Sequence, residues 1–377
     1  MAVTDAKQSD LDEFVAEDAV DELASLKHTN RALRAENRRM HERLGDWRAL
    51  MASFADAAHV LPKPRAAHIR ATASSEEKEA VLLLSDMHAN EAWSKRQTDG
   101  LTAYDYEKFC STLWFLCGEV VRLVEELRPT FGLRVLHIDM LGDILHGQLR
   151  LDDEVTNEFQ TVPAVAMTSY VLYQAIRLLS EHFEKVVVTA VPGNHGRLHK
   201  KPQSKRYVGE NLDTLIYCGI ASLLRVSGLE DRVSLAVPHS RVYSFERLGH
   251  KIKIGHGDHI KGGGGIANIP IFGLSRDILR QFRKEIKSAR QGECLEIIEF
   301  GHFHNSNILE DVLFLNGAFC PTGPWAMNDL GAFQDPKQWF YLTSRSHVYS
   351  WQIPLSLKRG ADAKHSFAVE CPGFPQD

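Results

Sequence analysis

The chain has 377 residues, of which 44% are hydrophobic and 25% are charged, and its formal net charge is −5. These fractions are typical of a soluble globular protein with one large domain or two ordinary ones. No apolar stretch is expected to supply the roughly 20 residues that a transmembrane helix needs, so we predict no membrane partner. The acidic balance does not favour nucleic acid, and a nucleic-acid partner would have to contact a local basic patch.

The opening segment and the cysteines predict a cytoplasmic location. The segment MAVTDAKQSDLDEF is acidic and lacks the apolar core of a secretion signal. The six cysteines are scattered and form no C-x-x-C motif. This usage suits a reducing compartment and argues against a disulfide framework or a thiolate zinc site.

Residues 1–60 carry a heptad pattern and are predicted to be a separate helical module. One seam position is occupied by Leu23, Asn30, Asn37, Leu44 and Met51, and the other by Leu26, Leu33, Met40, Trp47 and Phe54. Two Asn residues at a positions are typical of a parallel two-stranded coiled coil, because buried amides pair across its axis. We therefore expect a homodimer; the alternative is a single amphipathic helix on the chain's own globular domain. Residues 61–79 mix Pro, Ala, Ser and charge, which predicts a linker.

From residue 80 to residue 358, apolar segments typical of strands alternate with helical patterns. The expected strands are AVLLLSDMH at 80–88, LRVLHIDMLGD at 133–143, KVVVTAVPGNH at 185–195, HKIKIGHGDH at 250–259 and LEIIEFGHFHN at 295–305. Helical patterns cover Tyr104–Leu127, where Pro129 is expected to stop the helix, and Val162–Phe183. This alternation predicts an α/β domain in which helices cover both faces of a sheet. One or two strands within 337–355 would complete the sheet, and 359–377 is expected to be a tail.

Each of the five expected strands ends in polar residues. The candidate ligands there are Asp86, His88, Asp143, Asn194, His256, His302 and His304. Binding crevices in open α/β sheets lie beyond the carboxyl ends of strands, so we expect these side chains to converge. Imidazole suits zinc, iron and manganese, whereas carboxylate and amide oxygens favour harder ions. Seven ligands suit two metal ions that share a carboxylate, and a pair about 4 Å apart can assist phosphoester hydrolysis.

Taken together and in order, these motifs resemble those of the calcineurin-like metallophosphoesterases. The family pattern D-x-H, G-D, G-N-H, His and G-H-x-H matches DMH at 86, GD at 142, GNH at 193, GHGD at 255 and GHFH at 301. The resemblance covers about residues 80–320 and implies a four-layer αββα sandwich. It assigns one metal to Asp86, His88 and His304, the second metal to Asn194, His256 and His302, and the bridging position to Asp143.

The resemblance also implies a mechanism. A hydroxide held between two divalent ions, with manganese favoured over iron, zinc or magnesium, would attack phosphorus, and His195 would act as the general acid. The sequence departs from the usual pattern of the family at two places. The phosphate-gripping Arg that often follows G-D is missing from GDILHGQ, and Gly196 replaces the acidic residue that orients the His. His146, within the same GDILHGQ stretch, is a candidate for a supporting or substrate-binding role.

A basic segment at 196–206, GRLHKKPQSKR, follows His195 directly and is the candidate phosphate-binding segment, with Arg197, Lys200 and Lys201. Residues 275–290 are predicted to form a basic amphipathic helix. The chain also resembles nuclease-type members of the family, namely double-strand-break-repair nucleases and phage-encoded enzymes. We therefore expect a DNA nuclease, either an exonuclease or an endonuclease. The alternatives are a phosphomonoesterase or small-nucleotide phosphodiesterase, and a structural adaptor with a vestigial site.

Overall fold

The computed structural model describes residues 77–371, except 149–154, 200, 202–203, 261–268 and 289–294, together with a few positions before residue 55. The chain divides into two units, Met1–Ala52 and Ser53–Asp377. The predicted coiled coil and linker fall almost wholly outside the described residues. The fold and the site below belong to the second unit.

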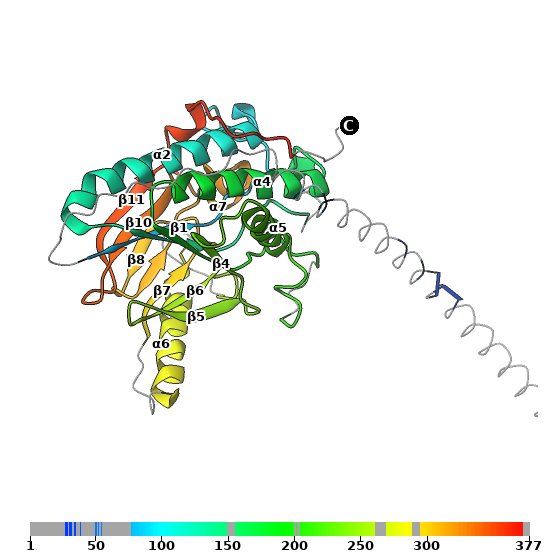
Figure 1. Ribbon diagram of the computed structural model, residues 1–377. Helices are drawn as coiled ribbons and strands as arrows, with labels where there is room; N and C mark the ends of the chain where they lie inside the picture. The colour runs from blue at the N-terminus through cyan, green and yellow to red at the C-terminus, as the bar shows by residue number, and fades with distance from the viewer. Residues whose placement is uncertain are drawn as a thin grey trace, which may run out of the picture. The chain divides into compact units, whose positions relative to one another are not determined.

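Two mixed β-sheets form the centre of this unit (Figure 1). The first has the order β11-β10-β1-β2-β3-β4, and the second has the order β5-β6-β7-β9-β8. The strands of the first sheet are β1 (Glu79–Leu84), β2 (Val135–Met140), β3 (Lys185–Ala190), β4 (Val233–Ala236), β10 (Lys337–Thr343) and β11 (Ser350–Ser356). Those of the second are β5 (Val242–Arg247), β6 (His250–Gly255), β7 (Leu295–Phe300), β8 (Asn307–Leu309) and β9 (Leu313–Leu315). Strands β1 to β4 run parallel, as do β6, β7 and β9, while the remaining pairs are antiparallel.

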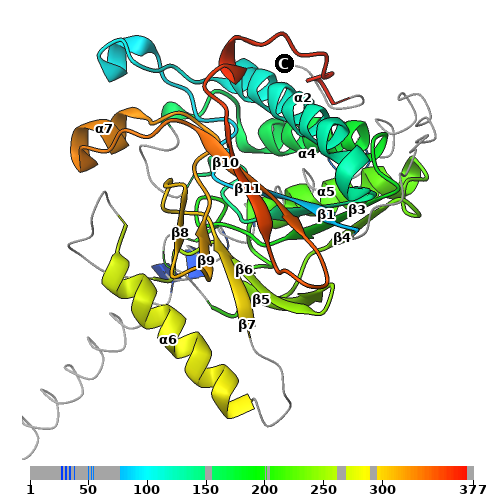
Figure 2. The same ribbon diagram turned by 90° about the vertical axis from the view of Figure 1, so that its left-hand side faces the viewer.

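The two sheets pack face to face, and helices cover their outer faces (Figure 2). The helices are α2 (Tyr106–Phe131), α4 (Thr161–Ser180), α5 (Leu212–Val226), α6 (Ile271–Ser288) and α7 (Pro324–Leu330), with short 3-10 turns at η1 (Lys95–Thr98) and η3 (Gly360–Asp362). The layer order of helix, sheet, sheet and helix is consistent with the αββα arrangement that the resemblance implies. The simpler expectation, one sheet with helices on both faces, is wrong because each sheet buries one face against the other sheet.

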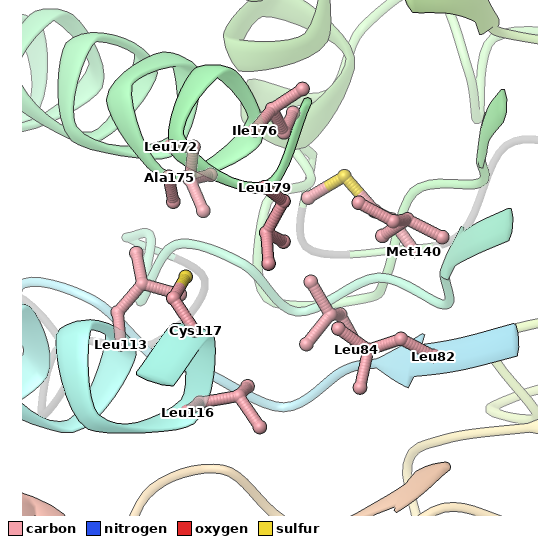
Figure 3. A pocket seen from close by; sticks show the side chains of 11 residues that line it. Leu82, Leu84, Leu113, Leu116, Cys117, Met140, Leu172, Ala175, Ile176 and Leu179 are labelled. Atoms are coloured by element: carbon pink, nitrogen blue, oxygen red, sulfur yellow. The ribbon is translucent and has the colours of Figure 1, made fainter. Parts of the chain in front are cut away.

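Strand β1 is apolar from Ala80 to Leu84 because both of its faces are buried there. Val81 and Leu83 pack against Ile252 and Ile297 of the second sheet. Leu82 and Leu84 point the other way and, with residues of β2, line a small apolar pocket closed by α2 and α4 (Figure 3). Because alternate side chains face two buried layers, both sets must be apolar.

Helix α6 forms the fourth layer. Its residues Leu274 and Ile278 belong to a core cluster with Ile298 and Leu313 of the second sheet. The opposite side of the helix is exposed at Phe272, Arg276 and other positions. Over 271–280, where the side chains are described, the helix has one buried and one exposed face, and it begins at Ile271, four residues before the expected start at 275.

A buried polar network crosses the interface between the sheets. Arg247 of β5 forms an ion pair with Asp139 of β2, and it donates a hydrogen bond to the Tyr341 hydroxyl of β10 at 2.8 Å. The Tyr341 hydroxyl in turn donates to Glu299 of β7 at 2.6 Å. Burial, with the nearby Asp139, raises the pKa of Glu299 well above its usual value, which favours the protonated form of this side chain. The network fixes β2 against β7 shortly before the residues that end these strands.

Two expectations about helices need correction. Helix α2 continues through Pro129 to Phe131 and ends at Gly132, whose φ of 64° and N–H bond to the Arg128 carbonyl form the cap. Pro129 lies in the last turn, where a missing N–H costs one bond and leaves the rest of the helix intact.

The second correction concerns α4, which among the described residues is the helix that is long enough and apolar enough to cross a membrane. However, 67% of its most apolar 18-residue window is buried inside the domain. Its apolar character is explained by its place between α2, α5 and the sheet.

Candidate metal centre

The carboxyl ends of strands from both sheets meet at one place, and all seven candidate ligands lie there. Asp86 and His88 follow β1, Asp143 follows β2, Asn194 follows β3, His256 follows β6, and His302 and His304 follow β7. Strands β1, β2 and β3 are parallel neighbours in one sheet, and β6 and β7 are parallel neighbours in the other. Their ends therefore fall at the same edge of the sandwich, as the crevice rule for parallel strands requires.

One half of the cluster contains Asp86, His88 and His304. The Nε2 atom of His304 lies 3.3 Å from Oδ1 of Asp86 and 3.3 Å from Nε2 of His88. The carboxylate of Asp86 also accepts a hydrogen bond from the backbone N–H of His302, at 3.0 Å to Oδ1 and 3.1 Å to Oδ2. Burial, together with the neighbouring His195, holds the pKa of His88 well below its usual value, so that its imidazole is neutral and suited to bind a cation.

The other half contains Asn194, His256 and His302. The Nε2 atom of His256 lies 2.9 Å from Oδ2 of Asp143 and 3.2 Å from Oδ1 of Asn194. Its Nδ1 atom donates to the Leu141 carbonyl at 2.8 Å, which fixes the ring with Nε2 directed into the site. Burial and the neighbouring His256 lower the pKa of His302 to about 4, which leaves that imidazole neutral as well.

Asp143 belongs to both halves. Ligand atoms of Asp86, His88 and Asp143 lie within 4.8 Å of one another, and so do those of Asp143, His256 and His302. Burial would raise the pKa of Asp143, but His256, His195 and His88 together outweigh burial and lower that pKa well below its usual value. Asp143 is therefore an anion placed between two groups of ligands, the position that a bridging carboxylate occupies.

The ligand loops adopt strained backbone conformations. Positive φ angles occur at Asp86 (52°), His88 (45°), Asp143 (52°), His302 (70°) and His304 (51°). Such angles are uncommon for residues other than glycine and concentrate at functional sites. Gly193 allows the loops to approach closely, because a Cβ there would collide with the carboxylate of Asp143. The glycine of the GNH motif is thus required by the position of the bridging residue.

Sequence reasoning missed Asp213, which holds the two central loops together. Its carboxylate accepts backbone N–H groups from Asp143 and Gly193, both at 2.9 Å, from Ile144 at 3.2 Å and from Leu145 at 3.1 Å. Burial, with the nearby Asp143, raises the pKa of Asp213 to about 6. The sequence offers only the Asn211 N-cap of α5 as a signal, and that pattern predicts a helix start and no contact with distant loops.

His195 lies beside the cluster without being one of the predicted ligands. Its backbone N–H donates to Oδ1 of Asp143 at 2.8 Å, and its ring centroid is 4.6 Å from that of His88. His146 is buried, and its Nδ1 atom lies 3.3 Å from Nδ1 of His88 and 3.5 Å from a carboxylate oxygen of Glu91. This placement favours a supporting role for His146, in orienting His88, over contact with a substrate.

The basic segment begins at the edge of the cluster. Arg197 is half-buried, and its Nε donates to the carbonyl of Asn194 at 3.0 Å. Lys201 and Lys205 are exposed. Arg206 forms an ion pair with Glu210 at 3.1 Å. Lys200 lies outside the described residues.

The donor set fits two divalent cations. It combines buried carboxylates, an amide oxygen and imidazoles, of which His88 and His302 are held neutral, within a few ångströms of one another. Without metal ions, the buried carboxylates of Asp86 and Asp143 face several ring nitrogens, and the proton on His256 supplies the positive charge. Such a cluster is favourable only when a positive charge is shared among its members. A further potential donor, Cys320, was not anticipated and lies within 4.8 Å of His88 and His304.

No protein-family model and no curated protein matches the sequence. Similar solved structures include a dimetal phosphatase from Danio rerio, with 12% identity, a TM-score of 0.32, and coverage of 74% of this chain and 98% of that one. A predicted phosphoesterase from Streptococcus pneumoniae has 11% identity, a TM-score of 0.26, and coverage of 75% and 99%. Zinc-complexed Vps29 from Entamoeba histolytica has 11% identity, a TM-score of 0.28, and coverage of 74% and 99%. Because these scores are low, the functional argument rests on the site residues.

The affinity for divalent metal should rise with pH. Burial opposes a charge on His256, but Asp143 outweighs it and raises the pKa of His256 to about 10 in the metal-free protein. The proton on Nε2 faces Asp143 and Asn194, so a cation must displace it. Affinity should therefore increase about tenfold per pH unit between roughly pH 7 and pH 9. Competition with a chromophoric chelator, corrected for the chelator's own protonation, measures this slope, and a flat profile would contradict the assignment of His256 as a ligand.

Replacement of Asp213 should destabilise the domain strongly. Asp213→Ala leaves four buried N–H donors without their acceptor, at about 1–3 kcal/mol each, so the free energy of unfolding should fall by more than about 3 kcal/mol. The control is Asp105→Ala, which removes one N-cap bond to Lys108 and should cost about 1 kcal/mol. Urea denaturation of the two variants provides the comparison. Equal losses would show that Asp213 is not the residue that holds the loops.

Proposed function

We propose that the chain is a two-metal phosphodiesterase of the calcineurin-like superfamily, and that it hydrolyses DNA. The observation that carries this proposal is the position of Asp143, which lies within 4.8 Å both of ligand atoms of Asp86 and His88 and of ligand atoms of His256 and His302. When bound there, two divalent ions, with manganese favoured, would lower the pKa of a water molecule and neutralise charge on a phosphate. A reducing cytoplasm suits such a protein, since none of the five described cysteines forms a disulfide.

Residues of the chain would position Asp143, donate a proton to the leaving oxygen and orient His88. Asp143 is fixed by the N–H of His195, by the imidazole of His256 and, through its backbone, by Asp213. The His195 ring lies against His88, next to the cluster, where it can donate a proton to the oxygen that leaves phosphorus. The buried His146, with the half-buried Glu91 beside it, would keep His88 in the orientation that the site needs.

Local positive charge supports DNA as the substrate. The exposed Lys201 and Lys205 lie on the segment that begins at the catalytic loop, and Arg276 and Arg280 are exposed on α6. Basic side chains on an otherwise acidic protein attract a phosphate backbone and give binding that weakens with salt. Arg197, whose Nε donates to the Asn194 carbonyl, could hold a substrate phosphate. Among the basic residues of the segment, it is the closest in sequence to His195.

Hydrolysis assays with manganese test the proposal. Labelled single- and double-stranded DNA are compared with bis(p-nitrophenyl) phosphate, with Asp143→Asn as the inactive control. Wild-type protein should cleave DNA, and the variant should lose cleavage of every substrate because the shared carboxylate is gone. Cleavage of the small diester alone would move the substrate to a small nucleotide. Absence of all hydrolysis would favour the adaptor role.

Charge reversal tests the DNA-binding segment separately. Lys201→Glu with Lys205→Glu should lower kcat/KM for DNA by on the order of tenfold or more and leave the small diester unaffected. The matched control is Lys358→Glu with Lys364→Glu, which makes the same change in net charge at exposed positions of the C-terminal segment. Equal effects of the two pairs on DNA cleavage would contradict a role for the segment.

We also propose that the N-terminal coil makes the protein a homodimer. Phe54, which the heptad pattern placed at the seam of the coil, is instead fully buried with its ring against Gly219 of α5, so a truncation should stop before it. Deleting residues 1–49 should convert a dimer into a monomer that still hydrolyses the small diester. Size-exclusion chromatography with light scattering measures both masses. A truncated protein that is still dimeric would refute dimerisation through the coil.

A further inference from the structure

A thiol lies beside the candidate metal centre, in addition to the predicted ligands. The side chain of Cys320 is buried, with 4% exposure. Its Sγ atom and one ring nitrogen each of His88 and His304 all lie within 4.8 Å of one another. The same two rings approach each other through their Nε2 atoms at 3.3 Å. Cys320 is thus one of three potential donors that surround a single point.

The position of Cys320 is fixed by the segment that carries it. The backbone N–H groups of Phe319 and Cys320 donate to the carbonyl of Asp86, at 3.1 Å and 3.3 Å. Earlier in the segment, the Asn316 side chain donates to the Ser85 hydroxyl at 2.9 Å. These bonds attach residues 316–320 to the strand end that supplies Asp86. The thiol is therefore held next to that half of the site by main-chain contacts.

We propose that Cys320 coordinates the metal ion bound by Asp86, His88 and His304, and that it selects a thiophilic ion for this position. Thiolate favours Zn²⁺, Co²⁺ and Cd²⁺ over Mn²⁺ and Mg²⁺, and coordination releases the thiol proton to solvent. Among the described residues, the group of Asp143, His256 and His302 contains no sulfur. The two positions therefore differ in chemistry, with a soft ion in the first and a harder ion in the second. This inference rests on the proposed metal centre and adds a ligand to it.

A buried cysteine can instead act as a small apolar side chain. Cys117 is such a residue, because it lines the apolar pocket between α2, α4 and the first sheet (Figure 3). It is as well buried as Cys320, with 2% exposure, and no His, Asp or Glu is among the residues that line that pocket with it. Cys117→Ala is therefore the matched control for substitution of Cys320.

Cobalt titration of the full-length, chelator-treated protein tests the proposal without an activity assay. Wild-type protein and Cys117→Ala should show a thiolate-to-cobalt charge-transfer band in the near ultraviolet, together with visible cobalt bands. Cys320→Ala and the near-isosteric Cys320→Ser should lose the charge-transfer band and keep visible bands from the second position. In Cys320→Ser, the affinity for Cd²⁺ should fall about tenfold or more. The affinity for Mn²⁺ should change by less than about threefold.

The outcomes separate this inference from the proposed function. Two cobalt ions bound by wild-type protein without a charge-transfer band would overturn the role of Cys320 and leave the metal centre in place. A charge-transfer band that persists in both Cys320 variants would also overturn it. Failure of wild-type protein to bind any cobalt would overturn both the metal centre and the thiolate ligand.

Discussion

The structure depends on how one buried carboxylate, Asp143, is held. Its carbonyl accepts the N–H groups of Met87 and His88 from the loop after β1, at 2.8 Å and 3.1 Å. Its side chain contacts the His195 N–H after β3 and the His256 ring after β6. A buried anion is costly unless it is paired, so these contacts are needed for the fold as well as for the site. Each loop that meets Asp143 also carries a candidate ligand or the predicted general acid.

This arrangement explains why the site lies between two sheets. Neither sheet alone supplies either group of candidate ligands, because Asp86 and Asn194 follow strands of the first sheet and His256, His302 and His304 follow strands of the second. The buried network of Arg247, Asp139, Glu299 and Tyr341 fixes the sheets against each other just before these ends. Asp213 then fixes the two loops of the first sheet. Cation binding would add to the stability of the domain, since the ligands come from segments far apart in the chain.

The sequence predicted the five strands that deliver ligands, because both faces of each are largely buried and a polar motif follows each one. Strands β4 and β5 were not predicted, since their half-exposed residues give no continuous apolar run, and the three-residue β8 and β9 are too short for a periodic signal. Two stacked sheets could not be told from one by residue pattern alone, because pairing partners are set by contacts between distant segments. Only the family resemblance implied them.

The site residues also fall into those that a sequence motif predicts and those that only the folded structure reveals. The seven candidate ligands could be named from motif order, and the structure brings all seven together. Residues that act through distant backbone groups, such as Asp213, or through loop packing, such as Cys320, have no local signature. Only the folded chain shows that the carboxylate of Asp213 reaches the turns at Asp143 and Gly193.

The central claim is that two cations share the carboxylate of Asp143. Anomalous diffraction from cobalt-loaded crystals of the full chain tests it most directly, because it locates the ions without any assumption about substrate. The account predicts two peaks about 3.5–4 Å apart on either side of the Asp143 carboxylate, one beside Asp86 and His304 and the other beside Asn194 and His256. A single peak, or two peaks of which only one contacts Asp143, would contradict it.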